Sequence, residues 1–140
     1  MTVSIEEAGN GIKDLIDDIA DPYIRQIMAP TDLSNSPNAY PCVLIIPGNI
    51  NYEQCHDALG LVSYRILVLA SAPDTKTGID RLLPLMELTG ANSIYARLAA
   101  DKTLNGKAKT SFIRSCSGVG YTDWNGTSYL STEFNIDVMV

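Results

Sequence analysis

The residue types best suited to chemistry are consecutive at one point, where Cys55, His56 and Asp57 follow one another. His56 is the only histidine in the chain. A catalytic thiol needs an imidazole that converges on it in space. Because neighbouring residues of a strand point to opposite faces, Cys55 and His56 seldom converge. We therefore interpret this stretch as a polar loop, and keep an enzyme that uses Cys55 and His56 as one hypothesis.

Metal and cofactor motifs are not visible in the sequence. A structural zinc site takes about four Cys or His ligands at short spacings, whereas the three cysteines and one histidine are scattered. Residues 118–120 (GVG) begin like a dinucleotide-binding loop but lack its third glycine and following helix. Asp17, Asp18 and Asp21 have cation-binding chemistry, yet we interpret them as a solvated helix face. The sequence thus predicts no catalytic residue, no cofactor and no metal.

Charge is spread unevenly along the chain. The formal net charge of −6 argues against a general nucleic-acid binder, because phosphate contacts need an excess of Lys and Arg. An acidic set lies near the N-terminus and a basic set lies later. These sets are Glu6, Glu7, Asp14, Asp17, Asp18 and Asp21, and Arg97, Lys102, Lys107, Lys109 and Arg114. Two interpretations stay open: solvated faces, or neighbouring copies that meet acid to base in an assembly.

Aromatic residues near predicted turns are a second candidate for protein contacts. The chain has seven tyrosines, several of them near turns, and Trp124 lies at a predicted hairpin tip. Aromatic residues are enriched at protein interfaces, although ordinary tyrosines on a sheet surface give the same pattern. The candidate contact residues are Asp14, Asp17, Asp18, Lys102, Lys107, Lys109, Tyr121 and Trp124.

These residues must be positioned by a sheet whose centre is the apolar run 61–72 (LVSYRILVLASA). Alternate residues of a strand share a face. One face of this run is almost wholly apolar, whereas the other begins with Ser63 and Arg65 and becomes apolar at Leu67 and Leu69. The run therefore predicts a central strand, buried along one face and buried on the other face only at its far end.

Helices are predicted on either side of this strand. Ser4 and Glu7 form a capping box that starts a helix, which we expect to end at Asp21-Pro22. A second helix is expected from Thr75 to about Gly90, with Pro84 kinking it or splitting it in two. A third piece, capped by Ser93, is expected to end at residues 105–106.

The remaining segments predict further strands. Residues 23–28 are a possible short strand, 29–41 a loop, 42–46 (CVLII) a buried strand stopped by Pro47-Gly48, and 110–117 another strand.

The clearest short signal is Asn125-Gly126 between strand-like runs, which favours a two-residue type I′ hairpin. This register places Trp124 opposite Thr127 and Tyr121 opposite Leu130. The last strand alternates, and we expect Glu133, Asn135 and Asp137 to face outward. Together the patterns predict one α+β domain over residues 1–140. It has an antiparallel or mixed sheet of four to five strands, helices on one face and a C-terminal β-hairpin.

From Asn51 onward the order of features resembles the tail terminator proteins of long-tailed, non-contractile bacteriophages, especially those that infect actinobacteria. The resemblance covers about two thirds of the chain. The matching pieces are Asn51-Tyr52-Glu53-Gln54 before Tyr64-Arg65, the helix after Pro73-Asp74, residues 93–98, Lys102-Thr103-Leu104-Asn105-Gly106, residues 120–130 with Gly126-Thr127-Ser128-Tyr129-Leu130, and Glu133-Phe134. Pro84, Lys107 and Lys109 depart from the pattern.

The resemblance implies a structural protein without catalysis. Such proteins form a sixfold ring on the head-proximal end of the tail tube, stop tube growth and join the head connector. The implied partners are further copies of the chain, the tail tube protein and a head-tail connector or stopper protein. DNA passes through the ring without specific binding, and no membrane is involved. The implied location is the neck region of the virion tail, with assembly in the bacterial host cytoplasm.

A closed ring of head-to-tail copies needs two different complementary patches on each copy. The acidic first helix and the basic segment 97–114 are the candidates. The alternatives are another head-tail neck protein of the same virion, and a small ligand-binding regulatory α+β domain.

Overall fold

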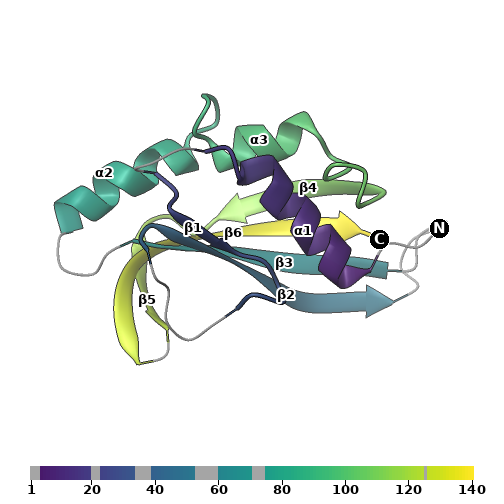
Figure 1. Cartoon of the computed structure of the whole chain (residues 1–140), viewed down its shortest axis with the longest axis horizontal. Helices are drawn as coiled ribbons and strands as arrows, with labels where there is room; N and C mark the ends of the chain where they lie inside the picture. Colours follow the sequence, from purple (N-terminus) through teal and green to yellow (C-terminus); the bar gives the residue numbers. More distant parts are fainter. Residues whose placement is uncertain (1–3, 20–22, 34–38, 53–59, 71–74, 125) are drawn as a thin grey trace.

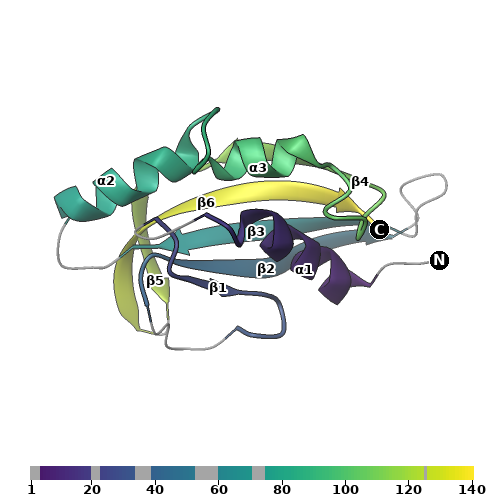
Figure 2. The ribbon, with the colours of Figure 1, turned by 45° about the horizontal axis from the view of Figure 1, so that its top comes forward.

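The computed structural model describes residues 4–19, 23–33, 39–52, 60–70, 75–124 and 126–140. Within these ranges the chain forms three helices and a mixed sheet of six strands, which confirms the predicted α+β class and adds one strand to the expected four to five. The helices lie together on one face of the sheet, as predicted (Figure 1; Figure 2).

The first helix begins at its predicted cap. The helices are α1 (Ile5–Ile16), α2 (Thr75–Met86) and α3 (Ile94–Ala100). The Ser4 hydroxyl accepts a hydrogen bond from the Glu7 amide at 3.0 Å and so caps α1. The helix ends before the predicted Asp21-Pro22, which lies outside the described residues. Ile19 still reaches the core, because its amide bonds back to the Ile16 carbonyl at 3.1 Å.

The other two helices differ from the predictions at their ends. α2 continues past Pro84 to Met86, so of the two predicted effects of Pro84 the split is wrong, and the helix ends before the expected Gly90. α3 starts at the predicted cap, where the Ser93 hydroxyl accepts from the Ala96 amide at 3.0 Å. It stops at Ala100 because its C-cap, Asp101, is extended, with φ −141° and ψ 94°. It does not resume as far as the expected 105–106, because Leu104 and Asn105 have positive φ angles of 50° and 58°. A right-handed helix cannot contain such residues.

The sheet is organised around its predicted central strand. Its strands are β1 (Gln26–Met28), β2 (Cys42–Tyr52), β3 (Gly60–Leu69), β4 (Thr110–Cys116), β5 (Gly120–Trp124) and β6 (Thr127–Met139). The order is β1-β2-β3-β6-β4, and β5 also pairs with β6. β3 runs antiparallel to β2 and β6, whereas β1 runs parallel to β2.

The predicted stop of the second strand at Pro47-Gly48 is wrong, because β2 continues to Tyr52 with a register shift between Pro47 and Ile50. β1 pairs only with residues 42–44 of β2. Beyond that point β2 is an edge strand on its outer side, where a proline costs no ladder hydrogen bond.

The C-terminal hairpin has the predicted register, with Trp124 opposite Thr127 and Tyr121 opposite Leu130. Gly126 has the positive φ that the turn requires, at 84°, and Asn125 lies outside the described residues. We call residues 120–124 and 126–131 the hairpin arm. The arm bends away from the helices at one end of the sheet (Figure 1; Figure 2). β4 and β5 lie on the same edge of β6, beside residues 134–139 and 127–131.

The main core lies between the helices and one face of the sheet. It combines the inner stripe of α1 with the apolar face of β3, as predicted, and its largest members include Ile12, Tyr64 and Phe134. Gly11 has a role in packing that the sequence did not indicate. A Cβ atom there would lie 2.4 Å from the Leu104 carbonyl oxygen, so α1 approaches residues 104–107 more closely than alanine permits.

The opposite face of the sheet is apolar only at one end, as the far end of β3 predicted. A second-face cluster of Met28, Cys42, Leu44, Leu67, Leu69 and Tyr129 lies there, with Leu33, Tyr40, Ile46 and Trp124 packed against it. The rings of Tyr40 and Tyr129 stack 5.4 Å apart and their hydroxyls are hydrogen bonded at 2.9 Å. The loop before β2 is thereby tied to the base of the hairpin arm.

Candidate interaction sites

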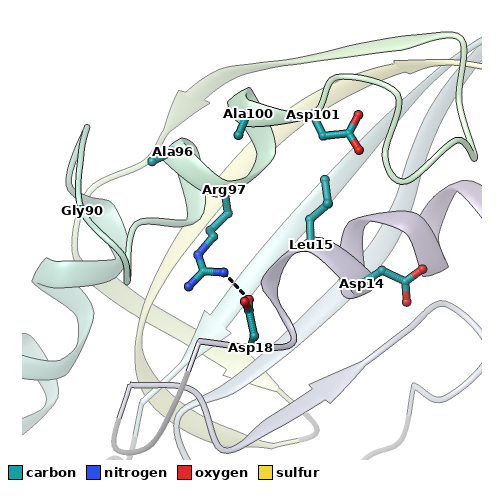
Figure 3. Close-up of a pocket in the computed structure, with 8 residues that line it drawn as sticks. All are labelled: Asp14, Leu15, Asp18, Gly90, Ala96, Arg97, Ala100 and Asp101. Atoms are coloured by element: carbon teal, nitrogen blue, oxygen red, sulfur yellow. Dashed lines mark hydrogen bonds and ion pairs between the residues drawn. The ribbon is translucent and has the colours of Figure 1, made fainter.

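The acidic and basic sets meet within one chain. The Lys107 ammonium lies 2.8 Å from an Asp14 carboxylate oxygen, and the Arg97 guanidinium forms an ion pair with Asp18. We call these four residues the α1–α3 seam. Figure 3 shows Arg97 extended from α3 toward Asp18, just beyond the end of α1. These members of the two sets are therefore partners inside the protein.

The seam lowers the pKa values of its carboxyl groups. The hydrogen bond from Lys107 holds the pKa of Asp14 below its usual 3.8, and the bond from Arg97 does the same to the pKa of Asp18. The pKa of Asp101 is also lowered, chiefly by the Thr103 hydroxyl, which donates to it at 2.6 Å. Each carboxylate thus stays ionised at neutral pH with a partner in the chain.

A hollow of about 380 Å³ opens beside the seam. Its lining residues, drawn in Figure 3, are Asp14, Leu15, Asp18, Gly90, Ala96, Arg97, Ala100 and Asp101. The three carboxylates have hydrogen-bonding partners in the chain. Among the described residues, no three His, Cys, Asp or Glu side chains gather as a metal ion would require. The hollow is a charged surface without an evident nucleophile.

The other charged candidates lie outside the seam. Asp17 is the exposed C-cap of α1. Lys102 and Lys109 are exposed beside the start of β4, and in the described part of the chain none of these three forms an ion pair. They remain predicted contact residues.

The two aromatic candidates lie on opposite faces of the hairpin arm, since three positions separate them in β5. Trp124 packs against the second-face cluster and helps to hold the arm. Tyr121 is 65% exposed. The structure therefore gives Trp124 a packing role and places Tyr121 on the surface of the arm.

A groove that the sequence did not indicate runs between the helices and strand β4. One hollow of about 180 Å³ is lined by Met86, Leu88, Tyr95, Ile113, Arg114, Ser115, Cys116 and Phe134. A smaller one of about 70 Å³ adjoins it and shares Tyr95 and Ile113, with Phe112 also on its wall. We call both together the β4-edge groove. Leu88 is 72% exposed at its rim. The only signal in the sequence was Leu88, an apolar residue that lies off the apolar stripe of the predicted second helix.

An arginine is fixed at the sheet edge beside this groove. The Arg114 guanidinium lies 3.1 Å from Asp137, whose second carboxylate oxygen accepts from the Ser63 hydroxyl at 2.8 Å. Asp137 was expected to be exposed, yet it is only 4% exposed, because Ser63 and Arg114 cover it on the face opposite the helices. The Arg114 side chain remains 62% exposed. A buried carboxylate therefore holds a surface cation in place.

Thiol chemistry has no support among the described cysteines. Cys42 is fully buried, and burial raises the pKa of its thiol to about 12, which keeps it protonated. Cys116 is exposed and lies 3.1 Å from the Thr132 hydroxyl. The hypothetical pair Cys55 and His56 lies outside the described residues.

No protein-family model matches the sequence, and no curated protein matches it. Each helix in the described ranges is too short or too polar to cross a bilayer.

Proposed function

We propose that this chain is a tail terminator of a long-tailed, non-contractile bacteriophage. Six copies form a ring on the head-proximal end of the tail tube. The ring ends polymerisation of the tube protein and presents its other side to the head-tail connector. The proposed role is structural, in the neck of the virion, and needs neither a cofactor nor a catalytic residue.

The observation that carries this proposal is a pair of different surface patches on one edge of the sheet. Among the described residues, seven large apolar side chains are exposed. Three of these, Leu88, Tyr95 and Phe112, line the β4-edge groove, and Val119 and Tyr121 lie at or just before the hairpin arm. A ring of head-to-tail copies requires two unlike patches on each copy, and this edge offers them.

Two further features support the proposal. The order of sequence features from Asn51 onward is similar to that of the tail terminators. The net charge of −6 gives the chain a field that disfavours adhesion of DNA, which suits a ring through which DNA passes.

Electron microscopy of the purified protein, alone and mixed with tail tubes of the same virion, tests the proposal. We expect sixfold rings, and tubes blunted at one end by an additional disc. Loss of the protein from the virion should give tubes longer than normal. Monomers that leave the tube ends bare would contradict the proposal.

The same experiment distinguishes a tail terminator from the closest alternative. If the chain were another head-tail neck protein, its loss would leave tails of normal length beside unattached heads. A ligand-binding regulatory domain would change neither tails nor heads.

A further inference from the structure

We infer that the hairpin arm of one copy docks in the β4-edge groove of the next copy. The inference rests on the proposed ring, and it names the contact that joins neighbouring subunits.

The groove has the size and lining for an aromatic side chain. An apolar cavity of about 150 Å³ accepts a benzene ring, and the larger hollow of the groove measures about 180 Å³. Met86, Leu88, Ile113 and Phe134 supply apolar walls, and Tyr95 adds an aromatic one. A buried aromatic side chain in such a pocket is the usual centre of an energetically important contact.

Arg114 also lines the groove, but its guanidinium lies across β4, bonded to Asp137 on the sheet face opposite the helices. Its partner Asp137 is buried, so the guanidinium is held there while most of its surface faces solvent. A guanidinium has five N–H donors, and the bond to Asp137 uses only some of them. This edge of the sheet therefore has donors left for a carboxylate of the incoming chain.

The hairpin arm carries the complementary groups. Tyr121 and Asp123 are two positions apart in β5, so they share one face of the arm, and both are exposed. Asp123 is the only charged residue among the described residues of the arm. An aromatic ring and a carboxylate side by side match a sheet edge that has an apolar groove on one face and an arginine on the other.

The arm of a copy is badly placed to fill its own groove. The groove lies on the helical side of β4, whereas the arm bends away from the helices (Figure 1; Figure 2). Each copy therefore offers one arm and one groove to different neighbours. Such a contact is head-to-tail, and it closes into a ring when the rotation between copies permits.

The test compares single variants on the two sides of the contact. Leu88→Glu places a charge in the groove, and Asp123→Lys reverses the charge of the arm. We expect each to weaken self-association by at least about 30-fold, as loss of a central interface residue does. Leu83→Glu is the matched control, because Leu83 is an exposed leucine of α2 outside the groove. All three should keep the wild-type circular-dichroism spectrum, and Leu83→Glu should keep wild-type rings by native mass spectrometry.

A mixing experiment makes the test specific. The Leu88→Glu variant keeps an intact arm, and the Asp123→Lys variant keeps an intact groove. Mixed in equal amounts, they should form heterodimers that grow no further. Wild-type rings from Leu88→Glu, or a mixture that stays monomeric although both variants fold, would overturn the docking and leave the ring standing. Rings that assemble through this contact but do not change tube length would overturn the proposed function alone.

Discussion

The α1–α3 seam and the sheet edge formed by β4 and β5 both present exposed side chains. The charged groups of the seam pair within the chain, whereas the apolar groups of the edge surround an open groove. At the seam, Asp14 and Asp18 have partners from the same chain, and Gly11 brings the backbones close together. At the edge, apolar side chains are exposed around an open groove, and Arg114 is held on the other face of β4. The difference teaches that a polarised charge pattern in a sequence can serve the fold, while the contact that we propose for assembly uses less conspicuous apolar residues.

The largest expected effect on the free energy of unfolding comes from the core beneath α1, compared with the sheet edge. Ile12 on the inner side of α1 is fully buried. Ile12→Ala should lower the free energy of unfolding by about 2–5 kcal/mol. Phe112→Ala at the half-exposed edge should cost about 1 kcal/mol or less. Urea unfolding of both variants measures the difference, and equal losses would contradict the contrast between a closed seam and an open edge.

Glycine substitutions sharpen the same contrast. Gly11→Ala forces its Cβ against the Leu104 carbonyl, so a backbone must move, at a cost of about 1–3 kcal/mol. Gly120→Ala at the start of β5 meets nothing within 4 Å. It should change stability by no more than about 0.5 kcal/mol. Thermal unfolding compares the two, and a neutral Gly11→Ala would show that the close approach is not needed.

Alkaline pH should lower the free energy of unfolding through two buried groups, Cys42 and Tyr64. Burial raises the pKa of Cys42 from 9.0 to about 12 and raises the pKa of Tyr64 well above 10.0. A folded-state pKa above the unfolded value gives stability that is complete below the unfolded pKa and is lost as the pH rises toward the folded pKa. We therefore expect the free energy of unfolding to fall above about pH 9, by up to about 1.4 kcal/mol per pH unit for each group.

Urea titrations at neutral pH and near pH 10 measure this loss. The double variant Cys42→Ala with Tyr64→Phe removes these two groups and should reduce the alkaline slope, and Tyr40, whose pKa burial also raises to about 12, accounts for part of what remains. An unchanged slope in the double variant would assign the loss to other residues.

The smallest expected effect concerns the ion pair between Asp14 and Lys107. Both side chains are more than a third exposed, so their coupling in a double-mutant cycle should be about 0.2–1 kcal/mol. The lowered pKa of Asp14 means that this contribution is present above its unfolded pKa and is lost as the pH falls through the folded pKa. Asp14→Asn, Lys107→Gln and the double variant complete the cycle, and Lys109→Gln serves as an exposed control. A coupling above about 2 kcal/mol would mean that the pair holds the seam together.

Much of the sheet followed from local patterns. The alternation in β3 predicted which face is buried throughout and where the other face becomes apolar. The Asn-Gly pair predicted the register of the hairpin, because its turn geometry leaves one choice of pairing. These features depend on residues that are close in sequence or on a strict period of two.

The interaction sites could not be predicted in the same way. Asp14 and Lys107 are 93 positions apart, and no local pattern indicates that α1 crosses the segment after α3. The β4-edge groove needs Leu88, Tyr95 and Ile113 from separate elements. Asp137 follows the alternation correctly, yet its burial depends on Arg114 from the neighbouring strand. Such sites are tertiary, and a single sequence shows their parts without their arrangement.

The position of β6 has a consequence for the order of events during protein synthesis. β4 and β5 pair with no strand except β6 within the described sheet, although both precede it in the chain. The groove and the arm are therefore both unformed until residues 127–139 have left the ribosome. A nascent chain has neither half of the proposed contact, which prevents premature joining of neighbouring chains on one messenger RNA.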